Sequence, residues 1–130
     1  MPDSVVVRDW LRHVESDLQI AETVPPPGVL LEHLCFHAQQ AAEKAIKMVL
    51  IAHDVVPPKI HNIERLFDLA SESVGPVPER LRPASSLTAF AVLTRYPADF
   101  GELDEEEWTA MVERARAVVV WARELVADQL

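Results

Sequence analysis

The sequence predicts an all-α protein, an up-and-down antiparallel bundle of four to five helices in one domain over residues 1–130. Apolar residues recur with a helical period along most of the chain, and no segment alternates as a β-strand does. Short proline-containing segments separate these periodic stretches, as in bundles with short connections. The chain has 130 residues, of which 49% are hydrophobic, so it can bury a core without a metal or disulfide.

The first two helices are predicted by apolar periodicity and by the prolines that follow each of them. The first should run from about Ser4 to Thr23, ahead of the prolines at 25–27. The second should run from about Val29 to His53, since a residue before proline is disfavoured in the α conformation and Pro57 follows. Its apolar arc is wider than one interface needs, so we expect at least two helical neighbours.

The third and fourth helices are predicted to be shorter than the first two. The third opens at His61 or Asn62, and asparagine is the better N-cap. The fourth is expected to be an α-helix from Pro83 to Arg95, with an irregular turn over Glu79 to Arg82 ahead of it. Both helices place apolar residues on one face only.

The fifth helix has the clearest start. Asp104 is the predicted N-cap, and Glu107 stands where the partner in a capping box belongs. From there the helical period of apolar residues continues to the C-terminus. Because the second and fifth helices both have apolar arcs wider than one interface needs, we expect a symmetric homodimer, with Trp121 at its surface.

The net charge of the chain argues against a general nucleic-acid-binding protein. The net charge is −9, which opposes sequence-independent binding of nucleic acid, because that affinity comes from basic residues on phosphates. Residues 29–70 contain four basic and five acidic groups, however, together with four of the five histidines. A local anion site in this nearly neutral segment is compatible with the overall charge.

Cysteine usage and apolar runs indicate the setting of the protein. Cys35 is the single cysteine, lies among apolar residues, and should be a small buried hydrophobe in a reducing cytoplasm. No apolar run approaches the roughly 20 residues of a membrane span. We expect no membrane association, no export signal and no cofactor.

Polar side chains gather on one narrow face of the second helix. This face contains five residues that fall within roughly 80° on a helical wheel: His33, His37, Gln40, Lys44 and Lys47. One interpretation places the two lysines on a phosphate, with Gln40 and His37 hydrogen-bonded to the rest of a nucleotide. The alternative is a solvated face with a Glu43–Lys47 pair at i,i+4, which contributes only a few tenths of a kcal/mol.

Other candidates lie near this helix in the sequence. His61, at the start of the third helix, should be exposed close to backbone N–H donors. Arg95 and Tyr96 can hold a phosphate and stack on a base, or anchor the loop after the fourth helix. His33 and His37 have the i,i+4 spacing of a chelating pair, but no acidic cluster accompanies them, so no metal site is expected.

Several short segments, in this order and spacing, resemble the HEPN family of small helical proteins. They are Trp10-Leu11 with Asp17-Leu18, Phe36 to Lys47, His61-Asn62-Ile63 and Thr94-Arg95-Tyr96-Pro97. The resemblance implies a bundle of four or five helices that dimerises. It also implies a minimal nucleotidyltransferase as partner, in a two-component or toxin-antitoxin module. Some members of this family bind nucleotides, and others are metal-independent ribonucleases.

The ribonuclease branch of that family carries an Arg-x(4–6)-His motif. Here the spacing occurs once, from Arg8 to His13 in the first helix, which is not the family's catalytic position. The isolated chain should therefore have weak or no ribonuclease activity.

Three hypotheses remain open from the sequence. The first is a non-catalytic subunit that binds a nucleotide or an RNA end. The second is a ribonuclease toxin with a degenerate motif, with His61 and either Arg95 or Lys47 as catalytic candidates. The third is a structural protein-interaction bundle.

Overall fold

The structure is a computed structural model that describes residues 3–92 and 102–130. All regular secondary structure within these ranges is helical, which confirms the all-α class. The elements in chain order are α1 (Ser4–Glu22), α2 (Leu31–Ala52), α3 (Ile63–Ser73), the 3₁₀ helix η1 (Glu79–Phe90), α4 (Glu105–Leu125) and the 3₁₀ turn η3 (Ala127–Gln129).

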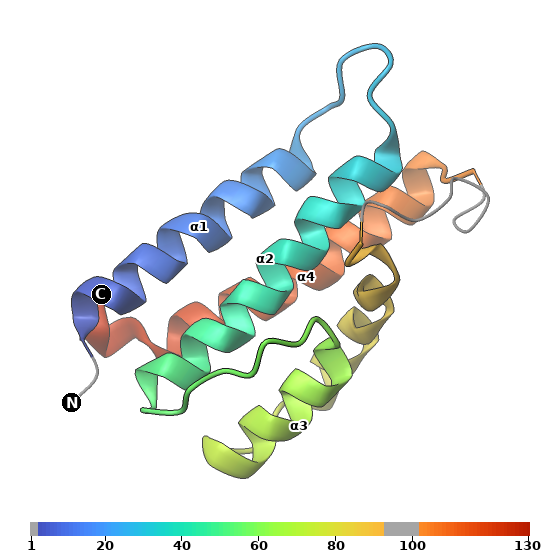
Figure 1. Ribbon diagram of the computed structural model, residues 1–130. Coiled ribbons are helices and arrows are strands. Elements are labelled where there is room, and N and C mark those ends of the chain that lie inside the picture. The colour runs from blue at the N-terminus through green and yellow to red at the C-terminus, as the bar shows by residue number, and fades with distance from the viewer. Residues whose placement is uncertain (1–2, 93–101) are drawn as a thin grey trace.

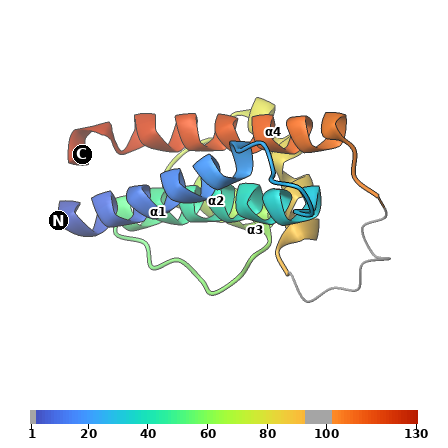
Figure 2. The same cartoon turned by 90° about the horizontal axis from the view of Figure 1, so that it is seen from above.

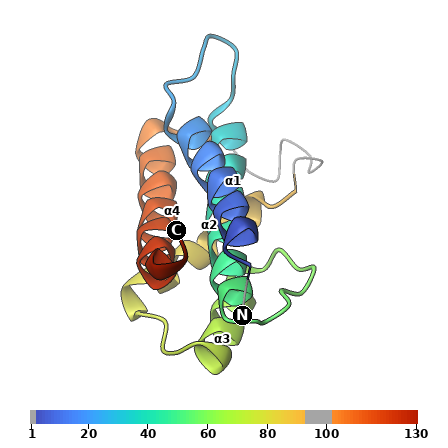
Figure 3. The ribbon, with the colours of Figure 1, turned by 90° about the vertical axis from the view of Figure 1, so that its left-hand side faces the viewer.

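The three long helices lie side by side, with α1 antiparallel to α2 and to α4 (Figure 1). The segment after α2 runs back along that helix, and α3 and η1 then pack against α2 and close the bundle. Seen from above, α4 lies alongside the α1–α2 pair (Figure 2). The start of α1 and the C-terminus lie at one end of the bundle (Figure 3).

Helix α2 is the centre of the molecule. It packs against α1, α3, η1 and α4, and every residue from Ala45 to Leu50 is buried. The expectation of at least two helical neighbours is confirmed. A polar side chain on this helix must therefore find a partner, because burying an unpaired polar or charged group costs several kcal/mol.

The helix ends follow local side-chain chemistry. Asp104 Oδ1 accepts from Glu107 N at 2.8 Å, and Asn62 Oδ1 accepts from Arg65 N at 3.1 Å, so both predicted N-caps are confirmed. Helix α2 ends in a Schellman motif with Asp54 in the left-handed region (φ 61°), just before the predicted stop.

The predicted fourth α-helix is wrong in type and in start. Residues 79–90 form a 3₁₀ helix that includes Pro83, a residue without an N–H to donate. Its buried residues recur every third position, which is the 3₁₀ period: Leu81, Ala84, Leu87 and Phe90. Residues 93–95 of the predicted helix lie outside the described ranges.

Trp121 belongs to the core, which corrects its predicted place at a dimer surface. Its side chain is buried and meets the ring of Phe67 edge to face, with centroids 6.3 Å apart. Cys35 is buried as expected, and burial, with smaller contributions from Glu107 and Glu32, raises the pKa of its thiol to about 12. None of the described helices is long and apolar enough to cross a membrane.

Candidate functional site

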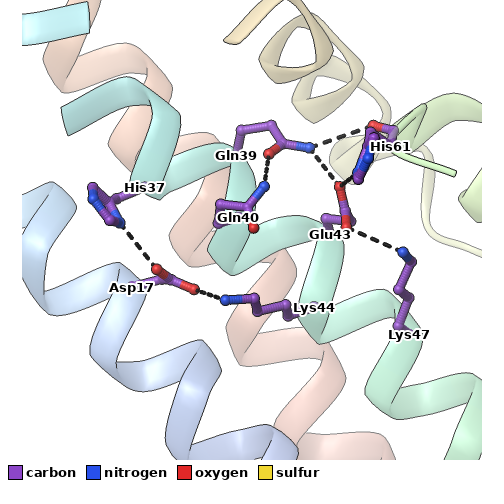
Figure 4. Close-up of polar contacts among 8 residues, drawn as sticks. All are labelled: Asp17, His37, Gln39, Gln40, Glu43, Lys44, Lys47 and His61. Carbon is purple, nitrogen blue, oxygen red and sulfur yellow. Dashed lines mark hydrogen bonds and ion pairs between the residues drawn. The ribbon is translucent and has the colours of Figure 1, made fainter. Parts of the chain in front are cut away.

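A carboxylate of α1 bridges two polar residues of α2. Asp17 Oδ2 accepts from Lys44 Nζ at 2.6 Å, and Asp17 Oδ1 lies 3.0 Å from His37 Nδ1 (Figure 4). The carboxylate is nearly buried, whereas the side chains of His37 and Lys44 are 31% and 28% exposed. These three residues are called the Asp17 network. It joins α1 to α2 and leaves two polar groups accessible at the surface.

A second carboxylate, on α2 itself, has the same two kinds of partner. Glu43 Oε1 lies 2.8 Å from His61 Nδ1 and accepts from Gln39 Nε2 at 3.0 Å. Glu43 Oε2 accepts from Lys47 Nζ at 3.1 Å. Glu43, Gln39 and Lys47 are buried, but the side chain of His61 is 60% exposed. These four residues are called the Glu43 network.

A chain of amides orients the Glu43 network. Gln40 Nε2 donates to Gln39 Oε1 at 2.7 Å, which turns the Gln39 amide nitrogen toward Glu43 (Figure 4). The same nitrogen lies 3.4 Å from the carbonyl oxygen of His61. Thr88 of η1 accepts from Ile63 N at 3.1 Å. The backbone that carries His61 is therefore held both from α2 and from η1.

Helical spacing explains why these side chains meet. Gln39, Glu43 and Lys47 follow one another at i,i+4, so they form one row on α2. Asp17 lies on the buried stripe of α1, three residues after Val14, and therefore faces α2.

The electrostatics of Glu43 result from opposing effects. Burial raises the pKa of its carboxyl, but hydrogen bonds from Gln39, His61 and Lys47, with the charge of Lys47, outweigh burial and hold the pKa below its usual value. Glu43 is thus a carboxylate at neutral pH. Since a carboxylate only accepts, the facing Nδ1 of His61 must donate. In a neutral imidazole this leaves Nε2 as an acceptor.

The predicted site residues divide into two groups. Five of them lie in or next to the two networks: His37, Gln40, Lys44, Lys47 and His61. Arg95 and Tyr96 lie outside the described residues. Sequence reasoning missed Asp17 and Gln39, and it gave Glu43 only as the partner of Lys47, not as the carboxylate that holds His61.

The alternative of a solvated face is wrong for Lys47, which is buried, whereas Lys44 is partly exposed. The Glu43–Lys47 pair exists as expected, but its side chains are only 6% and 10% exposed. Lys44 is also paired, so each lysine has a carboxylate partner. An anion at this surface would compete with these carboxylates for the lysines.

The described residues contain no arrangement of side chains typical of a metal centre. No group of three or more histidine, cysteine, aspartate or glutamate side chains there is arranged to hold a metal ion. His33 is exposed, and His37 is in contact with Asp17.

An all-α bundle around one polar-bearing central helix defines a class of small helical domains, and the family model of the HEPN domain matches residues 7–125. The chain therefore belongs to the HEPN domain family. It is similar to the crystal structure of an archaeal HEPN homologue, with a TM-score of 0.72 and 24% sequence identity over 92% of this chain and 97% of the other. That likeness concerns the fold. No curated protein matches the chain.

Proposed function

We propose that the chain is a nucleotide- or RNA-binding HEPN subunit that acts with a minimal nucleotidyltransferase partner in a toxin-antitoxin-like module. The observation that carries this proposal is a set of accessible hydrogen-bonding groups on and beside the mostly buried α2, with His37 and Gln40 on the helix and His61 just before α3. His37 and His61 are each held by a buried carboxylate, and the half-buried Gln40 lies next to both networks.

The charges in the two networks favour a small ligand over a long polyanion. Lys44 and Lys47 already face Asp17 and Glu43, so the site has little net positive charge to neutralise a run of phosphates. Recognition would depend on hydrogen bonds from two imidazoles and an amide. A nucleotide or an RNA end presents donors and acceptors of this kind in a small space.

The partner and the assembly belong to the same proposal. The family resemblance supports a minimal nucleotidyltransferase as partner, a homodimer as the working unit and the cytoplasm as the location. Light scattering at tens of micromolar protein tests the homodimer. A species of only 14.6 kDa would contradict it.

Ligand-induced thermal stabilisation tests the binding function. A nucleoside triphosphate or short RNA should stabilise the protein by about 2.7 kcal/mol at 100 times its dissociation constant. The variant His61→Ala should reduce this gain. His33→Ala is the control, because His33 is an exposed histidine of α2 that belongs to neither network. The absence of stabilisation with any nucleotide, RNA or nucleotidyltransferase would leave a protein-interaction bundle as the better account.

A second candidate function is a metal-independent ribonuclease, and one observation favours it. The buried Glu43 carboxylate holds Nδ1 of the exposed His61 at 2.8 Å, which is the arrangement that keeps the other ring nitrogen free as a general base. We expect weak or absent activity, since the Arg-x(4–6)-His spacing is not found at His61. Cleavage of single-stranded RNA in EDTA that His61→Ala abolishes would replace the binding proposal with this one.

A further inference from the structure

The indole N–H of Trp10 has no acceptor among the described residues, and unlike the buried Trp121 this side chain is only half-buried. Trp108 Nε1 donates to the carbonyl oxygen of Ala21 at 2.8 Å, and Trp121 packs against a core ring. Trp10, on α1, is half-buried against the core, and no residue in 3–92 or 102–130 accepts from its Nε1. Buried tryptophans usually find an acceptor, so the outer part of this indole is available to a ligand.

Two surface pockets flank the Trp10 side chain. One of about 260 Å³ is lined by Asp9, Trp10, His13 and Lys44. The other, of about 410 Å³, is lined by Val5, Val6, Arg8, Asp9, Trp10 and Arg12. Together these residues are called the Trp10 surface. Trp10 lines both pockets, so a group bound in either one lies next to this residue.

The Trp10 surface is basic in an acidic protein. Three basic residues line the two pockets against one acid, whereas the whole chain has a net charge of −9. Arg12 donates to Asp9 at 2.7 Å, which lowers the pKa of that carboxyl. Arg8 has no ion pair among the described residues. A half-buried aromatic ring close to Arg8 and Arg12 suits a base flanked by phosphates.

We infer that the Trp10 surface binds unpaired nucleotides of an RNA strand, with a base stacked on Trp10 and phosphates at Arg8 and Arg12. Lys44 lines one pocket and also belongs to the Asp17 network, so the surface is continuous with the site on α2. Arg8 and His13, the one match to the ribonuclease spacing, then contribute to binding. This inference rests on the proposed function, because it extends the RNA bound there onto α1.

Binding of a labelled oligouridine, followed by fluorescence anisotropy, tests the stacking contact. Trp10→Leu keeps an apolar side chain against the core and removes the ring, so affinity should fall about tenfold. Trp10→Phe should keep most of the affinity, because a phenyl ring still stacks. Duplex RNA of the same length should be insensitive to both changes, since its bases are already paired.

The salt dependence of the same binding tests the cations. Arg8→Ala should reduce the slope of log affinity against log salt by about 0.7, the value for one phosphate contact to a single strand. Arg80→Ala removes the same charge from an exposed arginine beside α4 and should leave the slope unchanged. Both arginines are exposed, so neither change should affect folding.

The outcomes separate this inference from the proposed function. If wild-type protein binds oligouridine and Trp10→Leu binds it equally well, the Trp10 surface has no role in RNA binding and the proposed function stands. If Trp10→Leu weakens only the complex with a nucleotidyltransferase, the surface is a protein interface and the inference is overturned. If wild-type protein binds neither RNA nor nucleotide, the proposed function and this inference both fail.

Discussion

The two networks of α2 use the same groups in different surroundings. In each, a carboxylate accepts from a lysine and holds Nδ1 of a histidine. The Asp17 network joins two helices, and its histidine and lysine are about equally exposed, at 31% and 28%. In the Glu43 network the lysine is only 10% exposed and the histidine 60%.

The Asp17 network therefore serves mainly to join α1 to α2, whereas the Glu43 network holds His61 in an exposed position. The Glu43 carboxylate is additionally bonded by Gln39, and its pKa is held low despite burial. Removing a partner from a buried charge costs far more than removing one from a pair that water can reach. The Glu43 network should therefore be the more rigid of the two, with His61 as its accessible end.

The largest effect is expected from Lys47→Ala. This change leaves Glu43 buried without its cation, so we expect the free energy of unfolding to fall by about 3 kcal/mol. Lys44→Ala should cost only about 1 kcal/mol, because water can reach the Asp17 pair more easily. Urea unfolding at neutral pH measures both. Equal costs would show that the two networks do not differ in this way.

The second largest effect on stability is expected from acid, which should weaken the Glu43 network. The pKa of Glu43 is lower in the folded protein than its ordinary 4.5, so its stabilisation is complete above about pH 4.5 and is lost as pH falls through the folded value. The difference in unfolding free energy between wild type and Glu43→Gln should therefore shrink as the pH is lowered through this window. Curves that stay parallel in acid would contradict the lowered pKa of Glu43.

The smallest effect is expected at a fully solvated pair. Arg12 and Asp9 lie 2.7 Å apart, but their side chains are 76% and 56% exposed. Arg12→Ala should leave the unfolding free energy unchanged within the error of the measurement, because water screens an exposed pair. A cost close to that of Lys44→Ala would mean that burial does not rank these ion pairs.

Local features of the fold could be predicted from the sequence. Asn62 and Asp104 cap their helices through bonds to residues three positions later, so the signal lies within one turn. The central place of α2 followed from its wide apolar arc. The 3₁₀ geometry of η1 had a signal as well, since its buried residues recur every three positions from Leu81, but such long 3₁₀ helices are uncommon.

The candidate site could be predicted only in part, because its partners come from different elements. The polar face of α2 gave His37, Gln40, Lys44 and Lys47. Helical spacing also gave the Glu43–Lys47 pair, but not Asp17 or the contact of Glu43 with His61. Asp17 is 27 positions from Lys44, and only packing of α1 on α2 joins them. The sequence did contain one sign that Asp17 has a partner, because it is a charged residue on the apolar stripe of α1.

The most direct test of the account is nitrogen NMR of the histidine rings, with and without RNA or nucleotide. In the free protein, neutral His37 and His61 should carry their proton on Nδ1, where each faces a carboxylate. On binding, the Nε2 signals of these two rings should shift, and the exposed His33 should not change. A proton on Nε2 of free His61, or no shift with any ligand, would contradict the claim that buried carboxylates hold these histidines for binding.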